Sequence, residues 1–87
     1  MALNFPNLMR RYDATRKCVR FSGYDGALER PFFIEEAAIY RLEPAAHKDE
    51  ASLLSAFDHH RDQIYETATR IYAQRREGSY TLKASDF

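Results

Sequence analysis

The chain has 87 residues, of which 45% are hydrophobic and 30% charged, as expected of one globular domain and not of a disordered chain. Thirteen basic and thirteen acidic side chains cancel, so the sequence lacks the basic excess that is typical of non-specific nucleic-acid binding. Cys18 is the only cysteine, which excludes an intramolecular disulfide and favours a reducing cytoplasm. No long apolar run follows the N-terminus, so we expect no signal peptide and no membrane span.

Residues 1–15 have neither a helical nor a strand period, and they contain several turn-forming residues. We therefore expect an ordered N-terminal arm instead of a regular element. Three apolar side chains are its predicted anchors: Phe5, Leu8 and Tyr12.

Residues 16–34 predict a β-hairpin. "KCVRFS" alternates between apolar and polar side chains, "GYDG" has the composition of a turn, and "ALERPFFI" follows as a second strand. Pro31 cannot donate a backbone hydrogen bond. The second strand is therefore an edge, carries a bulge, or is paired on one side only near the proline.

Two helices and a strand are expected next. Residues 35–42 predict a short helix, with Glu35 and Glu36 favourably placed in its first turn. A long helix is expected over 49–77, stopped by Gly78, and residues 79–83 alternate as a third strand.

The predicted order is β-β-α-α-β in one domain spanning residues 1–87. The fold class is α+β. A small antiparallel sheet, made of the hairpin and the C-terminal strand, packs on one long and one short helix, because this arrangement buries both apolar faces.

The stretch "FDHHRD", residues 57–62, contains adjacent histidines. On a helix, His59 and His60 point about 100° apart and cannot chelate one ion together. Helical zinc pairs need a second histidine four residues on, where this chain has Gln63 and Ile64. No nucleotide-binding or hydrolase motif is present either. We predict no metal site, no cofactor and no catalytic residue.

Arg61 is the unusual residue of this stretch, because it falls about 40° from Phe57 inside the apolar stripe of the predicted helix. Its stem can pack while its guanidinium remains in water. It can instead form a structural ion pair that ties a terminus to the helix, with Asp13 or Asp86 as partner. A ligand-binding arginine is the third reading.

Basic and aromatic residues gather in the arm and hairpin. They form a candidate interaction surface consisting of Arg10, Arg11, Arg16, Lys17, Arg20, Tyr24 and Arg30. Such residues on strands can bind single-stranded nucleic acid by phosphate contacts and base stacking. Acidic residues lie within the same stretch, and basic residues commonly protect exposed edge strands. A protein-interaction surface is therefore favoured over a nucleic-acid site.

Four segments, "FPN", "RRYDATRKCVRFSGYD", "LLSAFDHHRDQIYETATRIYAQ" and "SYTLKASDF", together resemble the bacterial family catalogued as domain of unknown function 1488 (DUF1488). The resemblance covers nearly the whole chain. It implies a small α+β fold in cytoplasmic proteobacterial proteins, with no established activity, cofactor or catalytic residue to carry over. It also draws attention to Tyr12, Asp13, His60, Arg61 and Asp86.

These observations favour a small cytoplasmic, non-enzymatic module that binds a macromolecule. The partner is an unknown protein or a second copy of the chain in a homodimer. The alternative is a weak nucleic-acid-binding or regulatory module that uses the basic hairpin. An enzyme with a site around His60 and Arg61 is the third hypothesis.

Overall fold

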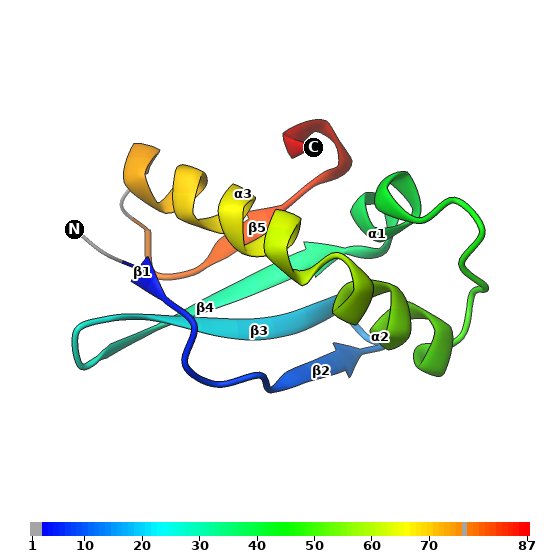
Figure 1. Ribbon diagram of the computed structural model, residues 1–87, viewed down its shortest axis with the longest axis horizontal. Coiled ribbons are helices and arrows are strands. Elements are labelled where there is room, and N and C mark those ends of the chain that lie inside the picture. The colour runs from blue at the N-terminus through cyan, green and yellow to red at the C-terminus, as the bar shows by residue number, and fades with distance from the viewer. Residues whose placement is uncertain (1–2, 76) are drawn as a thin grey trace.

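The computed structural model describes residues 3–75 and 77–87, which form an α+β fold (Figure 1). Its elements in chain order are β1 (Leu3–Asn4), β2 (Arg10–Asp13), β3 (Cys18–Asp25), β4 (Leu28–Glu35), α1 (Glu36–Leu42), α2 (Glu50–His59), α3 (Arg61–Gln74), β5 (Tyr80–Leu82) and the 3-10 helix η1 (Ala84–Asp86). The predicted fold class is confirmed.

The sheet is centred on β3. On one side of it, β1 and β2 pair antiparallel with different halves of β3, and on the other side β4 pairs antiparallel with all of it. β5 pairs with residues 32–34 of β4 in the parallel direction. The arm thus supplies two strands that the sequence did not predict, and the sheet is mixed instead of wholly antiparallel. The helices between β4 and β5 are the crossover that a parallel pair requires.

A two-residue turn, Gly26–Ala27, joins β3 to β4. Gly26 has a φ of +64°, the positive value that a type II′ turn needs at its first position. Pro31 lies opposite Ser22 and just before the residues of β4 that pair with β5. At the proline, β4 is therefore paired with β3 alone, so the missing N–H leaves no gap in the ladder with β5.

The prediction of one long helix over 49–77 is wrong, because two helices, α2 and α3, occupy this segment (Figure 1). They meet at His60, whose φ of −114° and ψ of 21° depart from helical values. The N–H of His60 is shared between the carbonyl groups of Ala56 and Phe57. α3 then ends at Gln74, and Arg76, which the prediction placed in the helix, lies outside the described residues.

The core lies between the helices and one face of the sheet. Alternate strand residues point into it, namely Val19, Phe21, Phe32, Ile34, Tyr80 and Leu82. The helices contribute the apolar stripe that the sequence predicted, including Leu53, Phe57, Ile64, Ala68 and Ile71. None of the described helices is long and apolar enough to cross a membrane.

The intervening strand residues point to the opposite face of the sheet, away from the core. We call this surface the open face and define it by Arg11, Asp13, Cys18, Arg20, Ser22, Tyr24, Glu29, Pro31, Phe33 and Glu35. Cys18 and Phe33 are buried there, yet neither belongs to the main hydrophobic cluster. They are therefore covered by side chains on the sheet's own surface.

The arm is attached to the core through Phe5. Its ring stacks on that of Tyr65 with a centroid distance of 4.0 Å. A Cβ atom added to Gly23 would lie 2.9 Å from the Phe5 ring, so glycine makes room for the arm at this point. Tyr12 also packs against the core. Leu8, predicted as a third anchor, is 66% exposed, because the chain leaves the sheet between β1 and β2.

Candidate functional site

Asp58, near the end of α2, links the arm to the helices. Arg10 of β2 donates to both carboxylate oxygens, from Nε to Oδ1 at 3.0 Å and from Nη2 to Oδ2 at 2.9 Å. Arg61 at the start of α3 donates to Oδ1 from Nε at 3.1 Å and from Nη2 at 2.7 Å. The hydrogen bonds from Arg10, followed by those from Arg61, hold the pKa of Asp58 below its usual range. One carboxylate therefore balances two guanidinium groups.

Arg61 has further partners. Its Nη2 donates to the backbone carbonyl of Leu8 at 2.7 Å, and its Nη1 donates to the Tyr65 hydroxyl at 2.6 Å. The side chain is only 17% exposed, and its guanidinium carbon lies 5.1 Å from the centre of the Phe57 ring. The stem is thus packed, and the charged group is tied both to α2 and to the arm.

The predicted pairing of Arg61 with Asp13 or Asp86 is wrong. Asp13 accepts a hydrogen bond from the backbone N–H of Arg16 at 3.1 Å in the β2–β3 turn. Asp86 accepts one from the N–H of Lys83 at 2.7 Å at the start of η1. The prediction considered carboxylates near the chain ends, whereas Arg61 pairs with the one three residues before it, across the helix junction.

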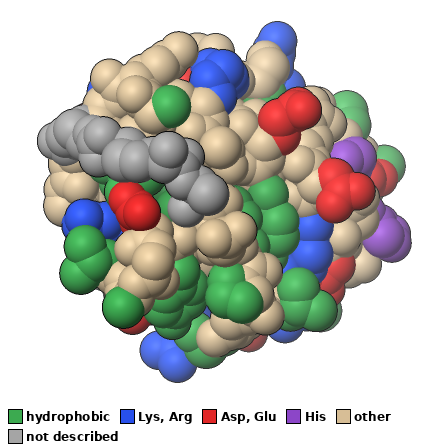
Figure 2. Space-filling view, turned by 60° about the vertical axis from the view of Figure 1, so that its left-hand side comes forward, with side chains coloured by type: hydrophobic (Ala, Val, Ile, Leu, Met, Phe, Trp, Pro, Cys, Tyr) green, Lys and Arg blue, Asp and Glu red, His purple; other side chains and the backbone are tan. Residues whose placement is uncertain are grey.

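The two histidines have different surroundings. His59 is exposed at the end of α2, whereas Nε2 of His60 lies 2.8 Å from a carboxylate oxygen of Glu43. Figure 2 shows histidine side chains beside acidic ones on the surface. Within residues 3–75 and 77–87, no group of three or more His, Cys, Asp or Glu side chains is placed to hold a metal ion. The hydrogen bond of His60 joins the segment after α1 to the helix junction.

Two titratable groups near the β2–β3 turn have raised pKa values. The Tyr12 hydroxyl donates to Glu36 at 2.6 Å, and this hydrogen bond is the largest of the causes that raise the pKa of Tyr12 to about 12. Burial raises the pKa of the Cys18 thiol. A protonated, 2% exposed thiol is a poor nucleophile, so Cys18 has the properties of a small packed side chain.

The predicted basic surface is divided between the two faces of the sheet. Arg10 points toward the helices and is bound to Asp58. Arg30 also points to the helix side, opposite Gly23, and its Nε is buried with no hydrogen-bond partner among the described residues. The remaining members lie on the open face or in the turn beside it: Arg11, Arg16, Lys17, Arg20 and Tyr24.

Phe33 is the large aromatic residue in the middle of the open face. The Arg16 guanidinium carbon lies 3.8 Å from the centre of its ring, and that of Arg20 lies 5.9 Å away. Both distances are within the range of cation–π attraction. Phe33 is consequently only 8% exposed, although no described helix covers it. The two arginines shield this ring from solvent.

Arg11 and Arg20 are directly opposite each other in the β2–β3 ladder, and both side chains are exposed on the open face. Like charges in this position repel each other. Within the described chain, neither arginine forms an ion pair with a carboxylate. A pocket of about 130 Å³ lies between them, lined also by Met9, Phe21 and Ser22.

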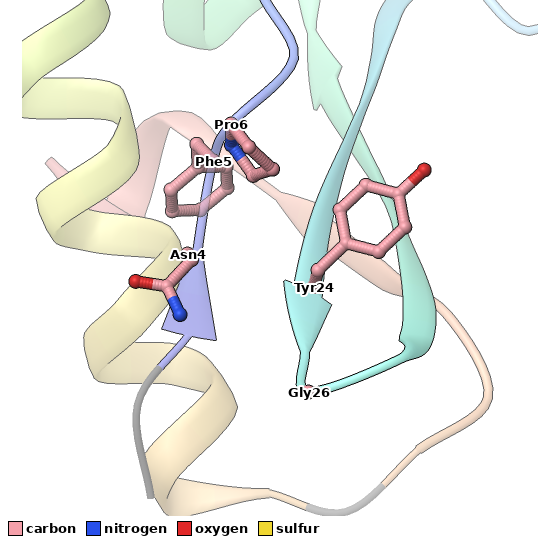
Figure 3. A pocket seen from close by; sticks show the side chains of 5 residues that line it. All are labelled: Asn4, Phe5, Pro6, Tyr24 and Gly26. Carbon is pink, nitrogen blue, oxygen red and sulfur yellow. The ribbon is translucent and has the colours of Figure 1, made fainter.

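A second, wider pocket of about 550 Å³ lies between the arm and the β3–β4 turn. Figure 3 shows Phe5 and Pro6 of the arm on one wall, Tyr24 of β3 on the other, and Gly26 at the turn. The Phe5 ring points to the helix side, and the Tyr24 ring points away from it. Of the lining residues, the sequence indicated Phe5 as an anchor, Tyr24 as part of the interaction surface and Gly26 as part of the turn, but it did not indicate that they line one pocket.

Comparison with known proteins establishes the family. The family described as "Protein of unknown function (DUF1488)" matches residues 3–83. The chain belongs to the DUF1488 family. The resemblance indicated by its sequence segments is thereby confirmed. Among curated proteins, none matches this DUF1488 sequence.

A similar solved structure is the crystal structure of a DUF1488-family protein of unknown function from Shewanella loihica PV-4. The two chains are 17% identical and superimpose with a TM-score of 0.81, over 92% of this chain and 90% of the other. At this identity, the similarity supports the fold of the DUF1488 chain and carries no information about its role.

Proposed function

We propose that this DUF1488 protein is a non-enzymatic binding module that docks a partner protein on the open face of its sheet. The observation that carries the proposal is the group of arginines on that face. Arg11, Arg16 and Arg20 lie close together with no carboxylate ion-paired to them in the described chain. Exposed arginine is enriched at protein interfaces, where it can pair with an acidic group and stack at the same time.

Single-stranded nucleic acid is the alternative ligand of the same surface. Base stacking needs an accessible aromatic ring, and the ring of Phe33 is already covered by Arg16 and Arg20. Tyr24 is a half-buried candidate for such stacking on this face. The zero net charge also weakens long-range attraction to a polyanion. These features favour a protein partner, including a second copy of this chain.

The region around His60 and Arg61 supports a structural role better than an enzymatic one. The Arg61 guanidinium is bound to Asp58, Tyr65 and a backbone carbonyl, and His60 is bound to Glu43. A catalytic acid or base must reach a substrate, and these groups are held by partners within the fold. The buried thiol of Cys18 fits our proposed location in a reducing cytoplasm.

A charge-reversal experiment tests the proposal. Arg11→Glu with Arg20→Glu changes the open face, and Arg70→Glu with Arg75→Glu makes the same change in net charge in α3 and at the residue that follows it. We expect the first variant, but not the second, to lose a specific protein that the wild type retains from nuclease-treated native extract, measured by quantitative mass spectrometry. Equal retention by both variants would overturn the proposal. Recovery that depends on nucleic acid would favour the alternative.

A further inference from the structure

The pocket between Arg11 and Arg20 lies where the pairing of β3 is interrupted. β1 pairs with Tyr24 and Asp25, and β2 pairs with residues 18–21. In the described chain, Ser22 and Gly23 therefore have no strand partner on this side of the sheet, although both remain paired with β4. The arm fills part of this interruption with Phe5 on the helix side and leaves a hollow on the open face.

The side chains around this hollow provide positive charge and an apolar wall. Arg11 and Arg20 line it from two neighbouring strands, and Met9, which is 52% exposed, lines it from the arm. Within the arm, the side chain of Asn7 accepts a hydrogen bond from the N–H of Met9 at 2.7 Å. Ser22, the remaining polar side chain in the pocket, donates its hydroxyl to Glu29 at 2.6 Å.

Three strand carboxylates lie on the open face, those of Asp13, Glu29 and Glu35, and none forms an ion pair with Arg11 or Arg20 in the described chain. Glu29 accepts the hydrogen bond from Ser22, and Asp13 accepts one from the N–H of Arg16. An anion in the pocket would relieve the repulsion between the two opposed arginines and gain charge-assisted hydrogen bonds from both.

We propose that this pocket binds the carboxylate of an Asp or Glu side chain in an acidic segment of the partner protein, with a neighbouring apolar residue of that segment against Met9. This inference rests on the proposed function and names the chemistry of its partner. A volume of about 130 Å³ corresponds to roughly four water molecules and admits a single carboxyl group. Two guanidinium groups match the planar geometry of a carboxylate.

The apolar surroundings favour a protein carboxylate over a nucleic-acid phosphate. Leu8 and Met9 are adjacent and strongly exposed in the segment between β1 and β2, at 66% and 52%. Exposed apolar side chains next to a charged pocket suit a peptide that carries both an acidic and an aliphatic residue. A phosphodiester backbone has no aliphatic side chain to cover them.

The test is a titration of the full chain, labelled with ¹⁵N, with the peptide acetyl-Ala-Leu-Glu-Leu-Ala-amide. We expect saturable shifts of the amide signals of Met9, Arg11, Arg20 and Ser22. Replacing the peptide's Glu by Gln, or using the Arg11→Gln or Arg20→Gln variant, should weaken binding about tenfold, as expected for the loss of a charge-assisted contact. Arg70→Gln is the matched control and should leave the affinity unchanged.

Three outcomes would overturn the inference: equal binding of the Glu and Gln peptides, equal effects of inorganic phosphate and of the Glu peptide, or tighter binding of an eight-nucleotide thymidine oligomer. Removing either arginine relieves repulsion, so both variants should melt no lower than the wild type. A loss of peptide binding in these variants would then not be explained by unfolding. Suppose instead that the peptide shows no binding while the charge-reversed protein still loses its cellular partner. That result would rule out the proposed carboxylate site but leave the proposed function standing.

Discussion

Arg10 and Arg11 are neighbours in β2, yet they belong to two different regions of the molecule. Arg10 points to the helices, where Asp58 accepts two hydrogen bonds from it and also binds Arg61. Arg11 points to the open face and meets Arg20 across the ladder. The charge of Arg10 is therefore paired and helps to hold the fold together, whereas those of Arg11 and Arg20 form no ion pair in the described chain and are available to a ligand. Strand alternation alone separates the two roles.

The largest expected difference between these regions is in stability. Arg61→Ala removes hydrogen bonds to Asp58, Tyr65 and Leu8 from a side chain that is 17% exposed. It should cost about 2 kcal/mol and lower the melting temperature by about 10 °C. Arg11→Ala is the open-face control and should change stability by less than about 0.5 kcal/mol. If thermal denaturation showed similar losses of stability for Arg61→Ala and Arg11→Ala, the proposed difference between the two regions would be contradicted.

A backbone position on the helix side gives the next largest effect. Gly23→Ala would place a Cβ atom 2.9 Å from the Phe5 ring and 3.0 Å from a Leu3 methyl group. We expect a loss of about 1–2 kcal/mol in urea denaturation, because the arm must shift to make room. Gly78→Ala is the control, since a Cβ there meets no described residue within 4 Å. An unchanged Gly23→Ala midpoint would mean that the arm is not docked over β3.

Acid should weaken the helix-side network. Its paired arginines depress the folded-state pKa of Asp58 below the usual 3.8, so the carboxylate stabilises the fold fully above that value. This contribution, about 1 kcal/mol for such an exposed pair, is lost as the pH falls through the folded-state pKa. The difference in unfolding free energy between the wild type and Asp58→Asn should thus be constant near neutral pH and shrink below pH 3.8. A difference that is independent of pH down to 2 would refute the pairing.

The smallest expected effect is on the open face and has the opposite sign. Arg20→Gln removes one of two opposed cations, so it should raise stability by about 0.3 kcal/mol at low ionic strength. Screening should abolish this gain at about 1 M salt. Urea denaturation of both proteins at low and high salt measures it. A loss of stability at low salt would show that Arg20 matters more for covering Phe33 than it costs by repelling Arg11.

Much of the fold could be predicted from the sequence because its determinants are local. The alternation around Val19 and Phe21, the turn composition at Gly26 and the apolar stripe through Phe57 and Ile64 each specify an element by period or residue type. The break at His60 has no glycine or proline to mark it. The sequence carries only two weak signals of this break, a histidine in the last turn of α2 and Asp62 in the first turn of α3.

The remaining features depend on contacts between distant segments. β2 is a strand because it pairs with β3, and the four residues "RRYD" carry too little pattern to predict it alone. Without that strand, Arg10 and Arg11 could not be assigned to opposite faces. The partner of Arg61 was missed for a related reason. The sequence predicted one continuous helix, so it did not predict the junction across which Asp58 pairs with Arg61.

Pro31 has a consequence for how copies of this protein can associate. In the described chain, β5 reaches only residues 32–34 of β4, so the first half of β4 borders solvent as a free sheet edge. An incoming strand would meet a proline nitrogen that cannot donate, flanked by the charged residues Glu29 and Arg30. Growth of a continuous intermolecular sheet from this edge, the route to fibrils, is therefore disfavoured.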